Sequence, residues 1–433
     1  MFVSIRGRVL INVEALNMTE SVGNYVKHRR LPVMTPTTYT TYFVPAISGE
    51  SIAHGFQEVL AEKAKNDSEL KDKVCNLCKQ GIFLKSTTSE VIKKSFNVQD
   101  EIQWLKSMVG NNITPNNIHE ALEKAIVSNC IVEDIGGFMY AEKSFGNVNV
   151  GSFKRTSCFS TGYMIPVKEA IEAVVIEPQL HTRFVQGMPY NPWQEKYQVP
   201  YYVELSSAPY VFSFDLDTKY VGKLTFSYEK AGELAVNNEK ERKKRVETAL
   251  ESLRHFLIEM LFGAKKTRFL PVIDWESVVI AVSNDTWTVP SPLSINYIKN
   301  TLHKFSKLNS VLKLFIYINP TIFEDTVTYV EKKTKEILDS FYKALDEFRK
   351  KLEERGDANL IDWNKFKKRK LEEFLDRKVD EVIKSSDLKY VSIIQEKYIE
   401  AVKRLKVEGI DIYENFEECI NDAIKEAEGE KQS

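Results

Sequence analysis

Four short stretches of the sequence place cationic side chains beside small or hydroxylated residues. A phosphate oxygen is bound by Lys or Arg together with a neighbouring hydroxyl or backbone N–H group. A single basic stretch is typical of a solvated surface, whereas four in an otherwise neutral chain favour a polyanionic partner. The stretches contain Asn24, Lys27, His28, Arg29 and Arg30, then Lys154, Arg155 and Thr156, then His181 and Arg183, and finally Lys265, Lys266 and Arg268.

A helix start offers a second kind of anion site. Ser48 can cap a helix whose apolar stripe includes Ile52 and Phe56, and the free N–H groups there attract a phosphate. His54 and Gln57 lie three residues apart, on the face opposite Ile52 and Phe56, and so could lie beside the same groove. The pattern leaves open whether His54 is instead a buried, hydrogen-bonded residue.

Motifs for catalysis or metal binding are lacking, since there is no Walker loop, no His-Glu-x-x-His and no Gly-x-Ser-x-Gly. Cys75 and Cys78 have the spacing of half a zinc site, but the other cysteines stand singly, which favours a structural role over metal. Glu133 and Asp134 would point to opposite faces of a strand that ends in a glycine turn. We therefore predict no catalytic residues, no metal and no cofactor.

Composition limits how a polyanion could be held. The 433 residues carry 60 Lys plus Arg against 61 Asp plus Glu, so the charge attracting a nucleic acid must be local. The longest apolar runs are far shorter than a bilayer span, and the N-terminus alternates like a strand rather than like a signal peptide. We expect a soluble cytoplasmic protein with no membrane partner, and five cysteines are too few for a disulfide scaffold.

The periodicity predicts an α+β protein. Residues 2–13 alternate like a half-buried strand with Arg6 and Arg8 on the outer face, and a second extended stretch leads into the helix after Ser48. Further strands and a long helix over 238–262 follow. This succession of strands and helices along the chain predicts a ferredoxin-like, RNA-recognition-type antiparallel sheet. We assign this unit, the palm, to residues 1–65 and 130–320.

Three further segments complete the predicted organisation. Residues 66–129 are polar and helix-biased, so they read as a helical insertion. Residues 178–205 are predicted to form two strand-like arms around a tip with Trp193, either a long hairpin or a protruding loop, which we call the thumb. Residues 321–433 are predicted as a separate, charge-rich helical extension, since 331–433 contain 23 basic and 26 acidic residues among 103.

Six motifs, in order, resemble one known family. They are "NVEALNMTESVGNYVKHRR", "VPAISGESIAHGFQ", "VEDIGGF", "FKRTSCFSTGYMIPV", "QLHTRF" and "GAKKTRFLP", spread over roughly residues 1 to 290. Together they resemble the backbone subunit of archaeal type I-A Cascade complexes, in the DevR-like autoregulator branch of the repeat-associated mysterious protein superfamily.

The resemblance implies a non-catalytic antiviral-defence subunit that binds a CRISPR guide RNA. Several copies would assemble along the RNA and, with other Cascade subunits, present its spacer to a target DNA strand. The residues implied to line the guide-binding face are Asn24, Lys27, His28, Arg29, Arg30, Ser48, His54, Gln57, Lys154, Arg155, Thr156, Arg183, Lys265, Lys266 and Arg268.

Two other functions remain open at this level. Related type III backbone subunits cut RNA with an acidic residue and a metal, and here the corresponding loop offers Glu20 alone, which makes a poor metal site. A transcriptional regulator would need a basic recognition helix, but Lys240 to Arg245 reads as the solvated face of a long helix. The resemblance does not place the tail beyond about residue 320.

Overall fold

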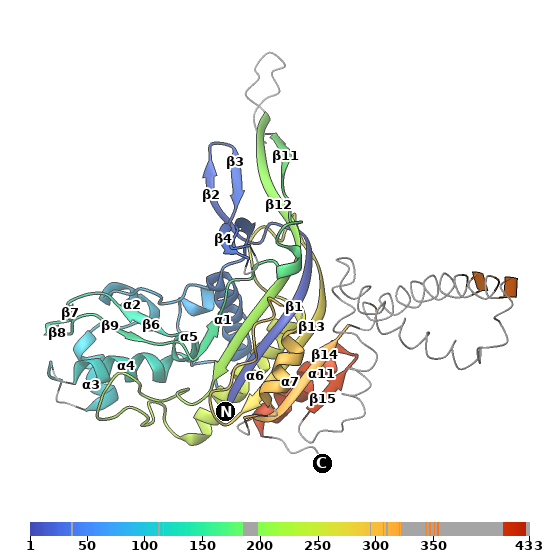
Figure 1. The fold of residues 1–433 in the computed structure, drawn as a ribbon. Coiled ribbons are helices and arrows are strands. Elements are labelled where there is room, and N and C mark those ends of the chain that lie inside the picture. The colour runs from blue at the N-terminus through green and yellow to red at the C-terminus, as the bar shows by residue number, and fades with distance from the viewer. Residues whose placement is uncertain are drawn as a thin grey trace.

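The computed structural model describes most of the first 321 residues and part of the tail (Figure 1). The gaps in the first part are residues 36–37, 111–112, 116, 185–197, 295, 306, 309–310 and 320. Beyond residue 321 it describes a few helical positions between 343 and 354 and then residues 410–429. The described chain is a mixed α+β structure built on a central, mostly antiparallel sheet, which confirms the predicted α+β class.

The central sheet is built around its first strand. β1 (Phe2–Glu14) pairs antiparallel with β12 (Gln198–Asp217) on one side and with β13 (Val272–Ser283) on the other. β14 (Val311–Ile318) extends the sheet beyond β13, while β10 (Phe159–Thr161) and β11 (Ile176–Phe184) both pair with β12. Segments from the whole length of the chain therefore meet in one sheet.

Both faces of β1 are buried, which differs from the predicted half-buried strand. Val3 and Ile5 face the main core, but Ser4 and Arg8, on the other face, are also fully buried. Arg8 forms ion pairs with Glu169 and Glu276, and the Ser4 hydroxyl accepts a hydrogen bond from Val289 N. The sheet has a second covering layer that includes α7 (Tyr297–Phe305). The sequence of β1 alone does not indicate that this layer buries its second face.

The main core lies between the sheet and three helices. α1 (Gly49–Asn66) packs against α6 (Glu239–Glu259), and α11 (Phe416–Glu428) packs against α6 in turn. Phe56 shows how tightly the layers meet, because its ring lies edge-on to those of Phe159, Phe214 and Phe256. α6 ends at Glu259, with Met260 in a left-handed conformation, so the helix stops three residues before the predicted end at residue 262.

A lobe beside the sheet contains the predicted helical insertion (Figure 1). Its helices are α2 (Ser89–Phe96), α3 (Glu101–Val109) and α4 (Ile118–Asn129), with small strands β6 (Phe138–Tyr140), β7 (Ser144–Phe145), β8 (Val148–Asn149) and β9 (Phe153–Arg155). Residues predicted as a strand around Glu133 instead form α5 (Ile131–Gly136). All of α5 is buried, so its sequence shows neither helical nor strand periodicity.

Two hairpins rise from the sheet in Figure 1, and a third forms a separate two-stranded sheet. β2 (Met18–Val22) pairs with β3 (Tyr25–His28), and β4 (Arg30–Met34) pairs with β5 (Thr41–Pro45). β11 and the first part of β12 form the described arms of the thumb, paired from Ile176 and Ser206 to Phe184 and Gln198. The thumb tip, with Trp193, lies outside the described residues.

Part of the tail belongs to the sheet. β15 (Ile410–Tyr413) pairs parallel with β14, and α11 covers the core beside it. The sequence predicted a separate helical extension over 321–433, so residues 410–428 correct that interpretation. A four-residue strand after a long polar segment has no periodicity from which to recognise it. Residues 322–342 and 355–409 lie outside the description.

Candidate nucleic-acid interface

The loop that carries Asn24 packs against the base of the thumb. β3 runs parallel to β12, and the Asn24 carbonyl accepts a hydrogen bond of 2.8 Å from Tyr202 N. The rings of Tyr25 and Tyr202 stack with their centroids 5.7 Å apart. Asn24 is exposed, so its side chain lies at the surface where the β2–β3 hairpin meets the thumb.

The loop with Arg268 reaches the same place from the far end of the chain. Arg268 Nη1 donates a hydrogen bond of 3.3 Å to the hydroxyl of Tyr201, and Phe269 contacts the ring of His181 at 5.2 Å. Ala264 N donates to the carbonyl of Leu16, which anchors this loop to the segment that follows β1. The two basic loops and the two thumb strands therefore converge; we call the site, formed by residues 24–30, 176–183, 199–204 and 264–269, the thumb base.

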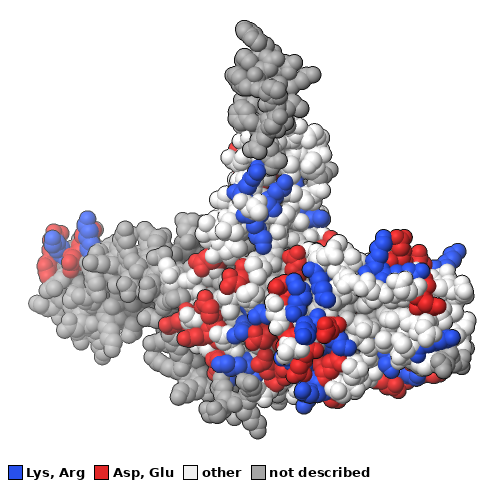
Figure 2. Space-filling model, turned by 180° about the vertical axis from the view of Figure 1, so that it is seen from behind, with Lys and Arg blue, Asp and Glu red and all other residues white. Residues whose placement is uncertain are grey.

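Exposed cations gather at this end of the molecule. Arg30 is 47% exposed in its side chain and forms an ion pair of 2.7 Å with Glu204, and Lys265 and Arg268 are also exposed. Arg29 is partly exposed and lies 6.0 Å from the ring of Tyr163. Figure 2 shows Lys and Arg on the lower part of the upright arm with few acidic residues among them, whereas the body below mixes both charges.

His28 is not part of this exposed surface. Its side chain is fully buried, with Nε2 2.5 Å from Glu14 Oε1 and Nδ1 3.0 Å from the carbonyl of Arg29. Burial alone lowers the pKa of His28, but the hydrogen bond and charge of Glu14 outweigh it and raise the pKa above its ordinary value. His28 thus holds the basic loop in place instead of presenting a cation to solvent, which corrects the prediction.

The helix start is also structural. Ser48 is buried, and its hydroxyl accepts a hydrogen bond of 3.2 Å from Ser51 N as the N-cap of α1. The carbonyl and side-chain oxygens of Asn17 bind Arg29 N and Ser48 N, so α1 is fixed relative to the basic loop. Ser48 is therefore not available as a direct anion ligand, contrary to the prediction, because its side-chain oxygen already accepts the capping hydrogen bond of α1.

His54 and Gln57 do not share a surface. His54 is 51% exposed, 3.3 Å from Glu58, and its ring lies 4.9 Å from that of Phe83. Gln57 is fully buried against Gly136, where an added Cβ would lie 2.0 Å from its Nε2. The prediction placed Gln57 on the outer face, and it is wrong because α5 covers that side of α1.

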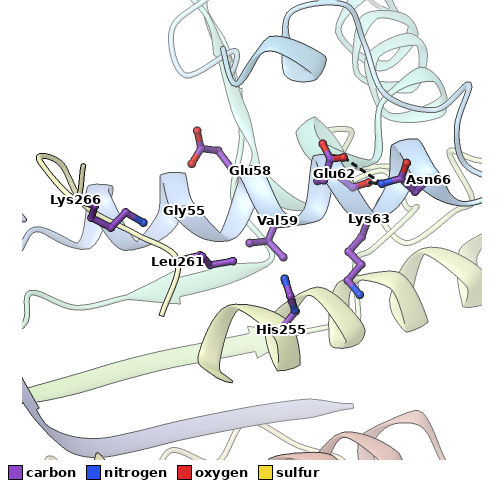
Figure 3. Close-up of a pocket in the computed structure, with 9 residues that line it drawn as sticks. All are labelled: Gly55, Glu58, Val59, Glu62, Lys63, Asn66, His255, Leu261 and Lys266. Atoms are coloured by element: carbon purple, nitrogen blue, oxygen red, sulfur yellow. Dashed lines mark hydrogen bonds between the residues drawn. The ribbon is translucent and has the colours of Figure 1, made fainter. Parts of the chain in front are cut away.

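A groove of about 540 Å³ lies between α1 and α6 beside Lys266 (Figure 3). Lys63 from α1 and His255 from α6 point into the space between the helices, whereas Glu58 points away from them. The lining mixes cations with Glu58 and Glu62, and no nucleophile and base are paired there. The groove thus offers no catalytic arrangement, and it places Lys266 close to α1.

Arg155 is buried in an ion-pair network far from solvent. It lies 2.7 Å from Glu123 and 2.6 Å from Asp134, and Arg245 binds the other oxygen of Asp134 at 2.9 Å. All four side chains have no exposed area. Arg155 is therefore not part of the predicted interface, because it pairs with the buried Glu123 and Asp134. Arg245 likewise pairs with Asp134, so it does not lie on the solvated helix face that the sequence suggested.

The neighbours of Arg155 remain exposed but lie elsewhere. Lys154 and Thr156 are at the surface on and just after β9, in the lobe with β6, away from the hairpins in Figure 1. Arg183 lies in β11, paired with Val199, and its side chain is outside the described set. The structure therefore brings together the basic loop, the thumb strands and the 264–269 loop, but not the 154–156 stretch.

Sequence reasoning missed several partners at the thumb base. Tyr201, Tyr202 and Glu204 connect β12 to the two basic loops, and Asn17 ties the loop to α1. The adjacent tyrosines in the strand "VPYYVEL" were a usable signal, because one side chain on each face of a strand can contact a different neighbour. Asn17 gave no comparable signal.

Comparison with known proteins identifies the family. The family model described as "CRISPR-associated negative auto-regulator DevR/Csa2" matches residues 5–302. The chain belongs to this family. Its relatives in Saccharolobus solfataricus include CRISPR-associated protein Cas7/Csa2 1, 33% identical over 72% of this chain and 90% of the relative. The CRISPR-associated aCascade subunit Cas7/Csa2 2 is 35% identical over 70% of this chain and 87% of the relative.

Two solved structures are also similar at a low level. A chain of a CRISPR RNA-guided surveillance complex in a pre-nicking state has a TM-score of 0.42 and 10% identity, covering 73% of this chain and 91% of that one. A chain of another CRISPR RNA-guided surveillance complex has a TM-score of 0.37 and 8% identity, with 73% and 89% covered. The family assignment rests on the sequence matches, and it confirms the resemblance inferred from the motifs.

Proposed function

We propose that the protein is a non-catalytic, cytoplasmic backbone subunit of a type I-A Cascade complex. In this role it binds a CRISPR guide RNA, assembles in several copies along it and, with other Cascade subunits, presents the spacer to a target DNA strand. Membership of the DevR/Csa2 family supports the proposal, as does the relative named as an aCascade subunit. Among the described residues, no helix is long and apolar enough to span a membrane.

The observation that carries the proposal is the thumb base. Exposed Arg30 pairs with Glu204 on the face of β12 where the Tyr25 and Tyr202 rings stack, and exposed Arg268 contacts Tyr201 on the opposite face. Cations bind the phosphates of a single strand and aromatic rings stack on its bases, so this pairing suits an RNA held without sequence preference. With a formal net charge of −1, the chain has little long-range attraction for nucleic acid, and a local site must supply it.

The order of strands and helices supports an RNA-recognition-type palm, which is part of this proposal. Along the sheet the order is β13, β1, β12 and β10, all antiparallel, with α1 between β1 and β10 and α6 between β12 and β13 in the chain. An RNA-recognition-type palm has this arrangement of strands and helices. The palm over 1–65 and 130–320, the insertion over 66–129 and the thumb over 178–205 are the divisions we propose.

The absence of catalysis is part of the proposal, and the acids near the basic loop support it. Glu14 accepts hydrogen bonds from His28, Tyr210 and Leu16 N, and Glu204 accepts from His28 N, Tyr25 and Arg30. A carboxylate used in this way has few lone pairs left for a divalent cation. Glu20, in β2 opposite Lys27, is the residue for the rival endoribonuclease; metal-dependent RNA cleavage lost in Glu20→Ala would favour that function.

The direct test is the loss of RNA on charge reversal at the thumb base. The double variant Arg30→Glu with Arg268→Glu is expected to bind guide RNA at least tenfold more weakly, with a salt dependence lower by about 2 phosphate contacts. Affinity is measured at several salt concentrations by fluorescence anisotropy. The size of the RNA-bound species is measured by light scattering, since a backbone subunit forms large assemblies on RNA.

The matched control reverses two exposed lysines far from the thumb base. Lys94 and Lys240 are 67% and 80% exposed, so Lys94→Glu with Lys240→Glu makes the same change in net charge on α2 and α6. This control should bind RNA within about twofold of the parent after correction for overall charge. Equal weakening in the two double variants would contradict a site at the thumb base.

A further inference from the structure

Three buried cysteines from distant parts of the sequence meet in the interior. The sulfur atoms of Cys75, Cys78 and Cys130 all lie within 4.8 Å of one another. The three residues are 4%, 1% and 0% exposed. Cys75 and Cys78 precede and begin a 3₁₀ turn, while Cys130 stands between α4 and α5. The sequence interpretation that the other cysteines stand singly is thus wrong for Cys130, because the fold brings it to the first pair.

The distances suit a tetrahedral metal ion. Zinc–thiolate bonds of about 2.3 Å at tetrahedral angles place two sulfurs about 3.8 Å apart. The sulfurs of Cys78 and Cys130 are 3.7 Å apart, and Cys130 Sγ also accepts a hydrogen bond of 3.5 Å from Cys75 N. Soft thiolate ligands select zinc over magnesium or calcium. The cluster is therefore close to the geometry of three zinc ligands without rearrangement of the backbone.

A buried carboxylate adjoins the cluster and points independently to a ligand. The sulfur of Cys78 lies 2.9 Å from Glu133 Oε1, which also accepts a hydrogen bond of 2.9 Å from Leu84 N. Glu133 is fully buried, and its Oε2 has no hydrogen-bond partner. A buried carboxylate oxygen without a donor is costly, and a metal ion would satisfy it.

The spacing repeats across the two halves of the site. The first half contains Cys75-x-x-Cys78 and the second contains Cys130-x-x-Glu133, so each half supplies two candidate ligands three residues apart. Paired ligands at short spacing from two separate segments are typical of structural zinc sites. Lys85 interacts electrostatically with both Glu133 and Cys78, which offsets the negative charge of thiolates and carboxylate.

We propose that Cys75, Cys78, Cys130 and Glu133 form a structural zinc site. The three thiolates are the fixed ligands, and Glu133 becomes the fourth by a side-chain adjustment, since it now contacts the cluster through Cys78. The site joins the two ends of the 66–129 insertion, because Cys75 and Cys78 follow its start and Cys130 follows its end. The proposal does not depend on RNA binding by the thumb base.

The test measures metal in the purified full-length protein. We expect close to one zinc per chain by mass spectrometry of the metal, and a fall of at least fivefold in Cys130→Ala and Cys78→Ala. The matched control is Cys419→Ala, which removes a thiol that is equally buried but lies in α11, and it should retain its zinc. Loading with Co²⁺ gives a second readout on the unmutated chain, since thiolate ligation produces intense sulfur-to-cobalt absorption.

Two other states of the cluster, free thiols without metal and a disulfide, would each contradict the zinc site. A chain with five titratable thiols, no metal and no change in Tm on adding zinc or a chelator would overturn the proposal. Two thiols missing without metal would overturn it as well, because a disulfide would then occupy two of the cysteines. Glu133→Gln, which keeps the size of the side chain, is expected to weaken zinc binding at least tenfold; unchanged affinity would reject Glu133 as the fourth ligand.

Discussion

At the scale of single residues, the basic loop is positioned by a histidine that solvent does not reach. Both ring nitrogens of His28 contact acceptors, Glu14 Oε1 and the carbonyl of Arg29. Only the imidazolium form donates from both nitrogens, so the environment favours the charged state and raises the pKa of His28. Because Glu14 also binds Tyr210, one buried carboxylate fixes the loop to β12.

This arrangement predicts a pH-dependent contribution to stability. Since the pKa of His28 is raised above 6.5 in the folded chain, its stabilising effect is complete below about pH 6.5 and is lost as pH rises through the folded-state pKa. The Tm deficit of His28→Gln relative to the parent should therefore be larger at about pH 6 than at about pH 9. Differential scanning calorimetry at both pH values measures it.

The matched control is His54→Gln, which changes a histidine that is 51% exposed. Its Tm difference from the parent should be small at either pH, since exposed ion pairs contribute little. A deficit in His28→Gln that grew with pH would show that His28 is buried in its neutral form.

At the scale of elements, a buried ion-pair network joins the lobe to the palm. Glu123 comes from α4, Asp134 from α5, Arg155 from β9 and Arg245 from α6. Glu123 also accepts a hydrogen bond from Thr225 N, and Asp134 accepts one from Gly222 N. Four elements are thus held by charges that would be costly to leave unpaired.

Removal of Arg155 should therefore destabilise the fold without acting through RNA. Arg155→Met leaves Glu123 and Asp134 short of a partner, so we expect a loss of about 3 to 5 kcal/mol in the free energy of unfolding. Urea unfolding followed by circular dichroism measures the loss. The adjacent Lys154→Met, at an exposed position, should change stability by less than about 0.5 kcal/mol. Equal, small effects in both variants would contradict the role of the network.

The sequence predicted the elements better than it predicted which cations face solvent. Alternation located β1 although both of its faces are buried, strand-like arms around a tip located the thumb strands, and apolar spacing located α1 and α6. Arg155 and Lys154 are adjacent basic residues with opposite burial, and only the carboxylates of α4 and α5 decide which is internal. Such partners are distant in sequence, so no local pattern reports them.

The same limit applies to Cys130 and to Gln57. Cys130 is 52 residues from Cys78, and only the packing of α4 and α5 brings them together. Gln57 is polar on a helix face that would be exposed in isolation, but α5 covers it. The motif resemblance, by contrast, identified the family because it used the order of several motifs and required no knowledge of contacts.

At the scale of the whole molecule, the fold closes with residues that the family match does not include. The family model ends at residue 302, yet β14, β15 and α11 extend the sheet and cover the core beyond it. Phe416 at the start of α11 stacks on Trp275 of β13 at 5.1 Å and meets Tyr317 of β14 at 5.4 Å. The C-terminal helix is thus part of the core that supports the palm.

Truncating Phe416 should therefore destabilise the whole chain. Loss of a buried aromatic side chain from a packed core costs about 3 to 5 kcal/mol, so Phe416→Ala is expected to lower the free energy of unfolding by that amount. The exposed neighbour Glu417 provides the control, since Glu417→Ala removes no core contact and should cost less than about 1 kcal/mol. Urea unfolding measures both.

RNA affinity distinguishes a loss of core packing from a loss of the interface. Phe416 contacts β13 and β14, whereas the thumb base is built from β3, β12 and the 264–269 loop, so folded Phe416→Ala should bind guide RNA like the parent. A variant with unchanged stability would contradict the role of Phe416 in the core. A stable variant with weakened RNA binding would instead place α11 at the interface, because unfolding could not then explain the weaker binding.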